Sequence, residues 1–194
     1  MSFIDFQQKH IVCKVVYYGP QGSGKTTNLD FVYARTSPPG SARPARPPSA
    51  GTTYDYLPLM LGEIRGFKTE FRLFTVAGAP DYAASRHEVL TGADGIVFVA
   101  DAQRSQQELN RASAAELEQL LASHGFRLGA LPRVLQLNKR DLDASIPIPE
   151  LAATLPALYQ DGATFEGIAT MGVGVFDSLK AIAKQILTEL KKGA

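Results

Sequence analysis

The feature that most limits the fold of this chain is a glycine-rich segment at residues 19–26, which reads Gly-Pro-Gln-Gly-Ser-Gly-Lys-Thr. Before it, an apolar and β-branched run at residues 11–18 predicts a strand, and after it residues 27–33 predict the opening of a helix. Such a turn forms an anion cradle, because backbone N–H groups point inward and the helix dipole adds positive charge. The segment fits the P-loop pattern G-x-x-x-x-G-K-S/T, so we expect it to bind the phosphates of a nucleoside di- or triphosphate.

The loop backbone and two of its side chains are the predicted phosphate contacts. Lys25 supplies a full positive charge, which makes it a candidate catalytic residue as well, and the Thr26 hydroxyl suits a metal ion on the phosphates. The predicted phosphate-binding residues within the loop are Gly19, Gln21, Gly22, Ser23, Gly24, Lys25, Thr26 and Thr27.

Length and composition indicate one globular domain over residues 1–194, with 45% hydrophobic and 20% charged residues. A net charge of +1 gives no electrostatic reason to expect a nucleic-acid partner. The lone cysteine, Cys13, falls in the first predicted strand and favours a small buried side chain over a disulfide. The sequence has no signal-peptide pattern, lipidation motif or membrane-spanning run, so we expect a cytoplasmic protein, monomeric on its own, without a direct membrane anchor.

Extended and helical patterns alternate along the chain, which predicts an α/β fold: a mostly parallel six-stranded sheet with one antiparallel edge strand and helices on both faces. The short segment 62–66 joins two strands into an antiparallel hairpin, and Pro58 places the first of them at the sheet edge. The apolar run at 95–100 suits a central strand covered on both faces. The predicted strands are residues 11–18, 54–61, 67–76, 95–100, 133–137 and 165–169.

Two further helices are predicted in the second half of the chain. One covers residues 105–123, with Ser105 as its N-cap and Gly125 just past its end. The other ends near Lys191 and Lys192, whose charges favour the dipole of a last helical turn. An apolar stripe at helical spacing marks this last helix, formed by Phe176, Leu179, Ala183, Ile186, Leu187 and Leu190.

Residues 37–51 use only Ser, Pro, Gly, Ala and Arg, and five of them are prolines. This composition predicts a flexible loop, because nothing in it can join a packed core. It follows the first helix, where a weakly packed segment could be ordered by a bound phosphate. The alternative is an inserted surface loop with no switching role.

The choice of base depends on residues 138–141, Asn-Lys-Arg-Asp, directly after the predicted strand 133–137. The Asp141 carboxylate can accept two hydrogen bonds from the N1–H and 2-amino group of guanine, whereas adenine offers no such donor pair. Asn138 would tie this loop to the P-loop, and the stem of Lys139 would cover the face of the base. The alternative is a solvated charged turn. These residues predict a guanine nucleotide.

Together these motifs resemble the Ras-like small GTPases, and more closely their bacterial MglA group, over nearly the whole chain. The resemblance implies a Ras-like G domain that binds GTP and GDP with Mg²⁺ and switches cell polarity and motility, with a roadblock-domain partner of the MglB type as its activator. It also implies that Ala169 and Thr170 contact the guanine through their backbone and that Gly78 contacts the phosphates. Besides the P-loop and 138–141, its most specific segments are 54–59, 66–69, 75–76, 95–101 and 172–176.

One departure from the wider superfamily concerns the metal. Ordinary small GTPases have D-x-x-G at the end of the third strand, with the Asp near the magnesium, whereas this chain begins that motif with Thr75. The MglA group also has threonine there. Asp55 on the neighbouring strand could supply the missing charge, or it could be a surface residue of an edge strand. Thr52 is a further candidate metal ligand.

Three other departures concern hydrolysis. Ala79 stands where small GTPases usually have the glutamine that orients the attacking water. Gln21 occupies a P-loop position that is generally glycine, where its side chain crowds the terminal phosphate or, alternatively, replaces the missing amide as a catalytic group. The Arg-Thr pair that the MglA group carries before its second strand aligns with residues 50–51, Ala-Gly. We therefore expect GTP binding with slow hydrolysis.

Residues 79–91 match the second switch of the family. Within them Tyr82, Arg86 and Leu90 follow helical spacing, so together with Ala79 they predict a face that binds a protein partner. Two other functions fit parts of the sequence: a pseudo-GTPase scaffold that acts by binding alone, and an ATP-dependent small-molecule kinase. Lys25 and Thr26 argue against an empty scaffold, and Asp141 argues against the kinase.

Overall fold

A computed structural model describes residues 3–38, 54–76, 83–160 and 162–192. In these ranges seven strands form one sheet in the order β3-β4-β2-β5-β6-β7, and β1 pairs with β2 beside that path. The strands are β1 (Phe3–Asp5), β2 (His10–Tyr18), β3 (Tyr54–Ile64), β4 (Phe67–Val76), β5 (Gly95–Asp101), β6 (Arg133–Asn138) and β7 (Ala163–Glu166).

The sheet is mostly parallel, as the alternation of patterns predicts. The pairs β2–β4, β2–β5, β5–β6 and β6–β7 are parallel, whereas β3–β4 and β1–β2 are antiparallel. β1 is a seventh strand that the sequence analysis does not predict. It pairs with residues 10–12 of β2, before the part of β2 at residues 15–18 that pairs with β5.

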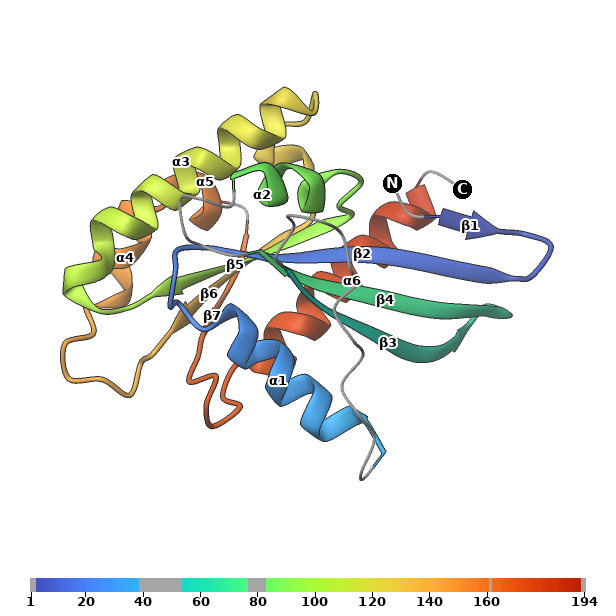
Figure 1. The fold of residues 1–194 in the computed structure, drawn as a ribbon, viewed down its shortest axis with the longest axis horizontal. Coiled ribbons are helices and arrows are strands. Elements are labelled where there is room, and N and C mark those ends of the chain that lie inside the picture. The colour runs from blue at the N-terminus through green and yellow to red at the C-terminus, as the bar shows by residue number, and fades with distance from the viewer. Residues whose placement is uncertain (1–2, 39–53, 77–82, 161, 193–194) are drawn as a thin grey trace.

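The helices cover both faces of the sheet (Figure 1). They are α1 (Lys25–Thr36), α2 (Ala83–Leu90), α3 (Gln107–Ser123), α4 (Ile148–Thr154), α5 (Pro156–Tyr159) and α6 (Val175–Lys192). Side chains alternate along β2, so that Val15 and Tyr17 face α1 and α6 while Val16 and Tyr18 face the layer formed by α2, α3, α4 and α5.

The predicted stripe of the last helix is confirmed. On α6, Leu179, Ala183 and Ile186 are buried, and Phe176, Leu187 and Leu190 pack against the same apolar cluster. Cys13 is buried within β2, as predicted. Among the described residues no helix has both the length and the apolar character needed to cross a membrane.

Three predicted boundaries are wrong in detail. β3 continues to Ile64, because Arg65 and Gly66 both adopt positive φ, of 51° and 81°, and close the hairpin in two residues. Ser105 is not an N-cap, since it lies in a 3₁₀ turn (Arg104–Gln106) and α3 begins at Gln107 without a side-chain cap. The last strand ends at Glu166, because the following backbone leaves the sheet to form a loop beside the P-loop. Pro58 does lie on an edge strand, as predicted.

Candidate nucleotide-binding site

The P-loop connects the end of β2 to the start of α1, so it lies at the carboxyl end of a parallel strand, where α/β sheets bind ligands. Glycine is required at two of its positions. A Cβ atom on Gly19 would lie 2.2 Å from the carbonyl oxygen of Val99, and one on Gly24 would lie 2.2 Å from Nδ2 of Asn138. Both glycines also have positive φ, of 140° and 103°. The loop backbone therefore lies so close to β5 and to the end of β6 that only glycine fits at these two positions.

Lys25 is the charged group of this loop, and 6% of it is exposed. Its Nζ donates hydrogen bonds to the carbonyl oxygens of Gly19 at 2.8 Å and Pro20 at 2.6 Å. Burial, and secondarily the charge of Arg86, lower the pKa of Lys25 to about 8. A phosphate beside the ammonium group would favour its charged form, so Lys25 is matched to an anionic ligand.

The loop after β6 is tied to the P-loop by Asn138, as the sequence predicts. Its Nδ2 donates to the carbonyl oxygen of Ser23 at 2.7 Å, and its Oδ1 accepts from the backbone N–H of Ala169 at 2.9 Å. Asn138 is 3% exposed, so these bonds are shielded from water. One side chain thus fixes the relative positions of the P-loop, the 138–141 loop and the loop after β7.

These three loops enclose a cavity of about 210 Å³. Asp141 lies at this cavity and is itself exposed, which leaves its carboxylate accessible to a ligand. The cavity brings together all the predicted guanine contacts and part of the P-loop, namely Asn138, Lys139, Asp141, Ala169, Thr170, Gly22, Gly24 and Thr27.

Lys139 is held at the cavity by a partner that the sequence analysis gives no role. Its Nζ lies 2.6 Å from Oδ2 of Asp101, the last residue of β5, which is 2% exposed. The backbone of Lys139 has φ of +66°. An apolar strand that ends in an aspartate is the sequence signal for this ion pair, because the carboxyl ends of neighbouring parallel strands meet at one edge of the sheet.

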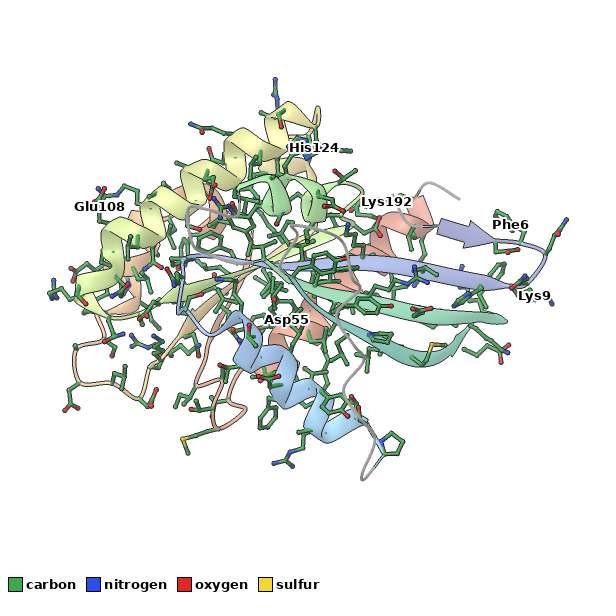
Figure 2. The ribbon with its side chains drawn as sticks, in the orientation of Figure 1. Phe6, Lys9, Asp55, Glu108, His124 and Lys192 are labelled. Atoms are coloured by element: carbon green, nitrogen blue, oxygen red, sulfur yellow. The ribbon has the colours of Figure 1, made fainter. Side chains whose placement is uncertain are left out.

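Asp55 is not a surface residue of the edge strand: it is 6% exposed, and its side chain points toward α1 (Figure 2). Its Oδ2 accepts hydrogen bonds from Oγ1 of Thr26 at 2.7 Å and from Oγ1 of Thr75 at 3.1 Å. Asp55 also lies directly opposite Thr75 in the β3–β4 ladder. The carboxylate that is absent at position 75 is therefore present on the next strand.

The oxygen atoms of Thr26 and Asp55 suit a hard divalent cation such as Mg²⁺. In the described ranges no cluster of three or more His, Cys, Asp or Glu side chains could hold a metal ion by itself. This donor set fits Mg²⁺, which typically uses one or two protein oxygens together with phosphate oxygens and water.

The predicted partner face is corrected by burial. Arg86 and Leu90 on α2 are 5% and 2% exposed, so neither is available to another protein. Arg86 pairs with Glu116 on α3, and Leu90 belongs to the apolar cluster between the sheet and α3. Four other predicted site residues and most of the 37–51 loop lie outside the described residues: Thr52, Gly78, Ala79 and Tyr82.

Comparison with known proteins agrees with this geometry. No protein-family model matches the chain. The chain is 45% identical to the mutual gliding-motility protein MglA of Myxococcus xanthus, and the alignment covers the full length of both proteins. An alignment of this extent and identity shows common ancestry. The chain belongs to the MglA-type family of Ras-like small GTPases.

Proposed function

We propose that this protein is a guanine-nucleotide switch that binds GTP and GDP with Mg²⁺, hydrolyses GTP slowly and controls motility or polarity through a protein partner. The observation that carries the proposal is the bond from Asn138 to the Ser23 carbonyl oxygen, which joins the phosphate cradle to the cavity containing Asp141. A guanine nucleotide requires a phosphate site and, next to it, a carboxylate that selects the base.

Each group around the cavity would hold one part of the nucleotide. The P-loop N–H groups and Lys25 hold the phosphates, while Asp141 accepts hydrogen bonds from N1–H and the 2-amino group of guanine. Ala169 and Thr170 line the same cavity as Asp141. The backbone N–H of Ala169 already donates to Asn138, so the N–H of Thr170 would complete the base contacts. Thr26 and Asp55 would hold Mg²⁺, which supplies positive charge to the phosphate oxygens when bound.

Slow hydrolysis is proposed from the residue types at the reacting end. Phosphoryl transfer depends on positioning of water and stabilisation of charge, and an arginine finger alone contributes about 10³–10⁵ in rate. Ala79 has no group that orients water, and residues 50–51 supply no arginine. Gln21 is exposed on the P-loop and carries a side-chain amide near this end.

The proposal of a motility role rests on the relative, whose name assigns it to mutual gliding motility, and the polarity role is what the family resemblance suggests. A roadblock-domain protein of the MglB type is the partner that the family resemblance suggests. A pseudo-GTPase scaffold is the second candidate, and Ala79 and Gln21 are the residues that favour it. A pull-down with the candidate partner in GDP and in a non-hydrolysable GTP analogue separates the two, because a switch binds differently in the two states and a scaffold binds equally.

The nucleotide itself is tested by mass analysis of what the purified protein releases on denaturation. We expect GDP or GTP at close to one molecule per chain. Release of adenine nucleotides, or of no nucleotide from a protein that also fails to bind added GDP, would contradict the proposal.

A further inference from the structure

A charge pair between α2 and α3 lies next to the phosphate end of the site. Arg86 donates from Nε to Oε1 of Glu116 at 2.8 Å, and its Nη2 lies 2.7 Å from the same oxygen. The Arg86 side chain is 6% exposed and that of Glu116 is 35% exposed. Charge-assisted bonds of this length, made by a guanidinium that is itself shielded from water, hold that guanidinium in one position.

The pair is anchored to the strand that carries the P-loop. Tyr18, the last residue of β2, donates its hydroxyl hydrogen to Oε2 of Glu116 at 2.8 Å. Burial, and then the hydrogen bond to Glu116, raise the pKa of Tyr18, so the phenol stays protonated as a donor. Gly19, the first P-loop residue, follows directly in the chain. Glu116 therefore connects α2 to the start of the P-loop.

Arg86 and Glu116 share a cavity with the P-loop. This cavity, of about 340 Å³, is lined by Gly19, Pro20 and Gln21 on one side and by Arg86 and Glu116 on the other. The cavity of about 210 Å³ that contains Asp141 is lined by the later part of the loop, at Gly22, Gly24 and Thr27. The charge of Arg86 also reaches Lys25, whose pKa it lowers. A nucleotide whose base occupies the cavity of Asp141 would thus extend its phosphates along the P-loop toward Arg86.

We propose that the Arg86–Glu116 pair sets how strongly the protein prefers a nucleoside triphosphate to a diphosphate. The inference rests on the proposed guanine-nucleotide function and adds a specificity residue, Glu116, to it. Arg86 attracts the charge of a third phosphate, while the Glu116 carboxylate cancels most of that attraction. Removing the carboxylate charge should therefore favour the triphosphate more than the diphosphate.

The alternative is that the pair only fastens α2 to α3. Fastening affects the free energy of unfolding but gives no reason for a change in the ratio of two nucleotide affinities. An electrostatic role, in contrast, changes that ratio with opposite signs for the two charges and fades as salt is added. The ratio and its salt dependence therefore distinguish the two roles.

The test measures Kd for GDP and for a non-hydrolysable GTP analogue at fixed Mg²⁺ in four variants and the unmodified protein. Glu116→Gln keeps the size of the side chain and one of its two acceptor oxygens while it removes the negative charge, and Arg86→Gln removes the cation. Glu118→Gln removes one negative charge from an exposed position on the same helix. Tyr18→Phe removes the hydroxyl bond to Glu116 without a change in charge.

We expect Glu116→Gln to raise the preference for the triphosphate about three- to tenfold and Arg86→Gln to lower it by a similar factor, both effects shrinking as salt rises from about 0.05 to 0.5 M. Glu118→Gln and Tyr18→Phe should leave the ratio within about twofold. If the protein binds guanine nucleotides but Glu116→Gln leaves the ratio unchanged, or changes it no more than Glu118→Gln does, the inference is wrong and the proposed function stands. If the unmodified protein binds neither nucleotide, both fail.

Discussion

The hydroxyl of Thr26 donates a hydrogen bond to Oδ2 of Asp55 over 2.7 Å, which joins the first turn of α1 to the edge strand β3. The same oxygen accepts a bond from Thr75, its opposite residue in the ladder. A carboxylate on β3, opposite Thr75, thus reaches the P-loop threonine. A chain with threonine at position 75 in this way keeps a negative charge beside the proposed metal site.

Asp55→Asn tests this role. The substitution keeps an oxygen acceptor for Thr26 and removes the charge, so we expect Mg²⁺ to strengthen GDP binding about tenfold less than in the unmodified protein. GDP affinity in EDTA should change little. Titrations with and without Mg²⁺ measure both, and Glu63→Gln, at an exposed position of the same strand, is the control. An equal gain from Mg²⁺ in both variants would rule out a metal-related role for Asp55.

Asn138→Ala should lower both stability and nucleotide affinity. It leaves the Ser23 carbonyl oxygen and the Ala169 N–H without their partner. Unpaired buried groups cost about 1–3 kcal/mol each, so urea unfolding of the nucleotide-free protein should show a loss of about 2–4 kcal/mol. Asn138→Asp should lose more, because a carboxylate oxygen would face the Ser23 carbonyl oxygen. Unchanged stability in both variants would mean that this tie does not hold the loops together.

The lowered pKa of Lys25 predicts that the stability of the nucleotide-free protein depends on pH. Its pKa falls from an ordinary value of 10.5 to about 8 on folding, so the unfolded chain binds more protons between these values. Stability should therefore rise as pH increases through that window, by about 3 kcal/mol at ~1.4 kcal/mol per pH unit. Lys25→Met should lack this rise and should also fail to bind GDP. Urea unfolding at pH 7 and pH 10 of the two proteins, compared as a difference, measures it; parallel pH profiles would contradict the cause given for the shift.

Ala79→Gln should speed the GTP hydrolysis that we propose to be slow. A glutamine at this position supplies the amide that orients water in ordinary small GTPases, so we expect single-turnover GTP hydrolysis to rise about tenfold or more. Ala79→Ser, which is polar but too short, serves as the control. Hydrolysis in the unmodified protein at the rate of an ordinary small GTPase, lost in Gln21→Ala, would instead show that Gln21 replaces the missing group.

Much of the fold follows from local sequence patterns. The P-loop motif marks the strand and helix that flank it, and the short segment between β3 and β4 marks their hairpin. A continuous apolar run marks β5, and apolar residues at helical spacing mark α6. The tie from Asn138 to the P-loop also follows, because both loops extend from carboxyl ends of strands in one parallel sheet.

Features that depend on packing between distant segments could not be predicted in the same way. Helical spacing of Arg86 and Leu90 identifies one face of α2, but the spacing does not say whether that face meets solvent or α3. The face is internal because Arg86 bonds to Glu116 on α3, which lies thirty residues along the chain. The burial of Asp55 could not be predicted for the same reason, because its carboxylate accepts hydrogen bonds from Thr26 and Thr75 on other elements. The three-residue strand β1 is too short for a periodic pattern.

The central claim is that Asp141, exposed at a cavity shared with the P-loop, selects guanine. The most direct measurement is the ratio of Kd values for GDP and ADP on the nucleotide-free protein, because these ligands differ only in the base. A site that pairs with two base donors and leaves its carboxylate unpaired with the wrong base should favour GDP by about 10⁴. Affinities for GDP and ADP within tenfold of each other would contradict the account.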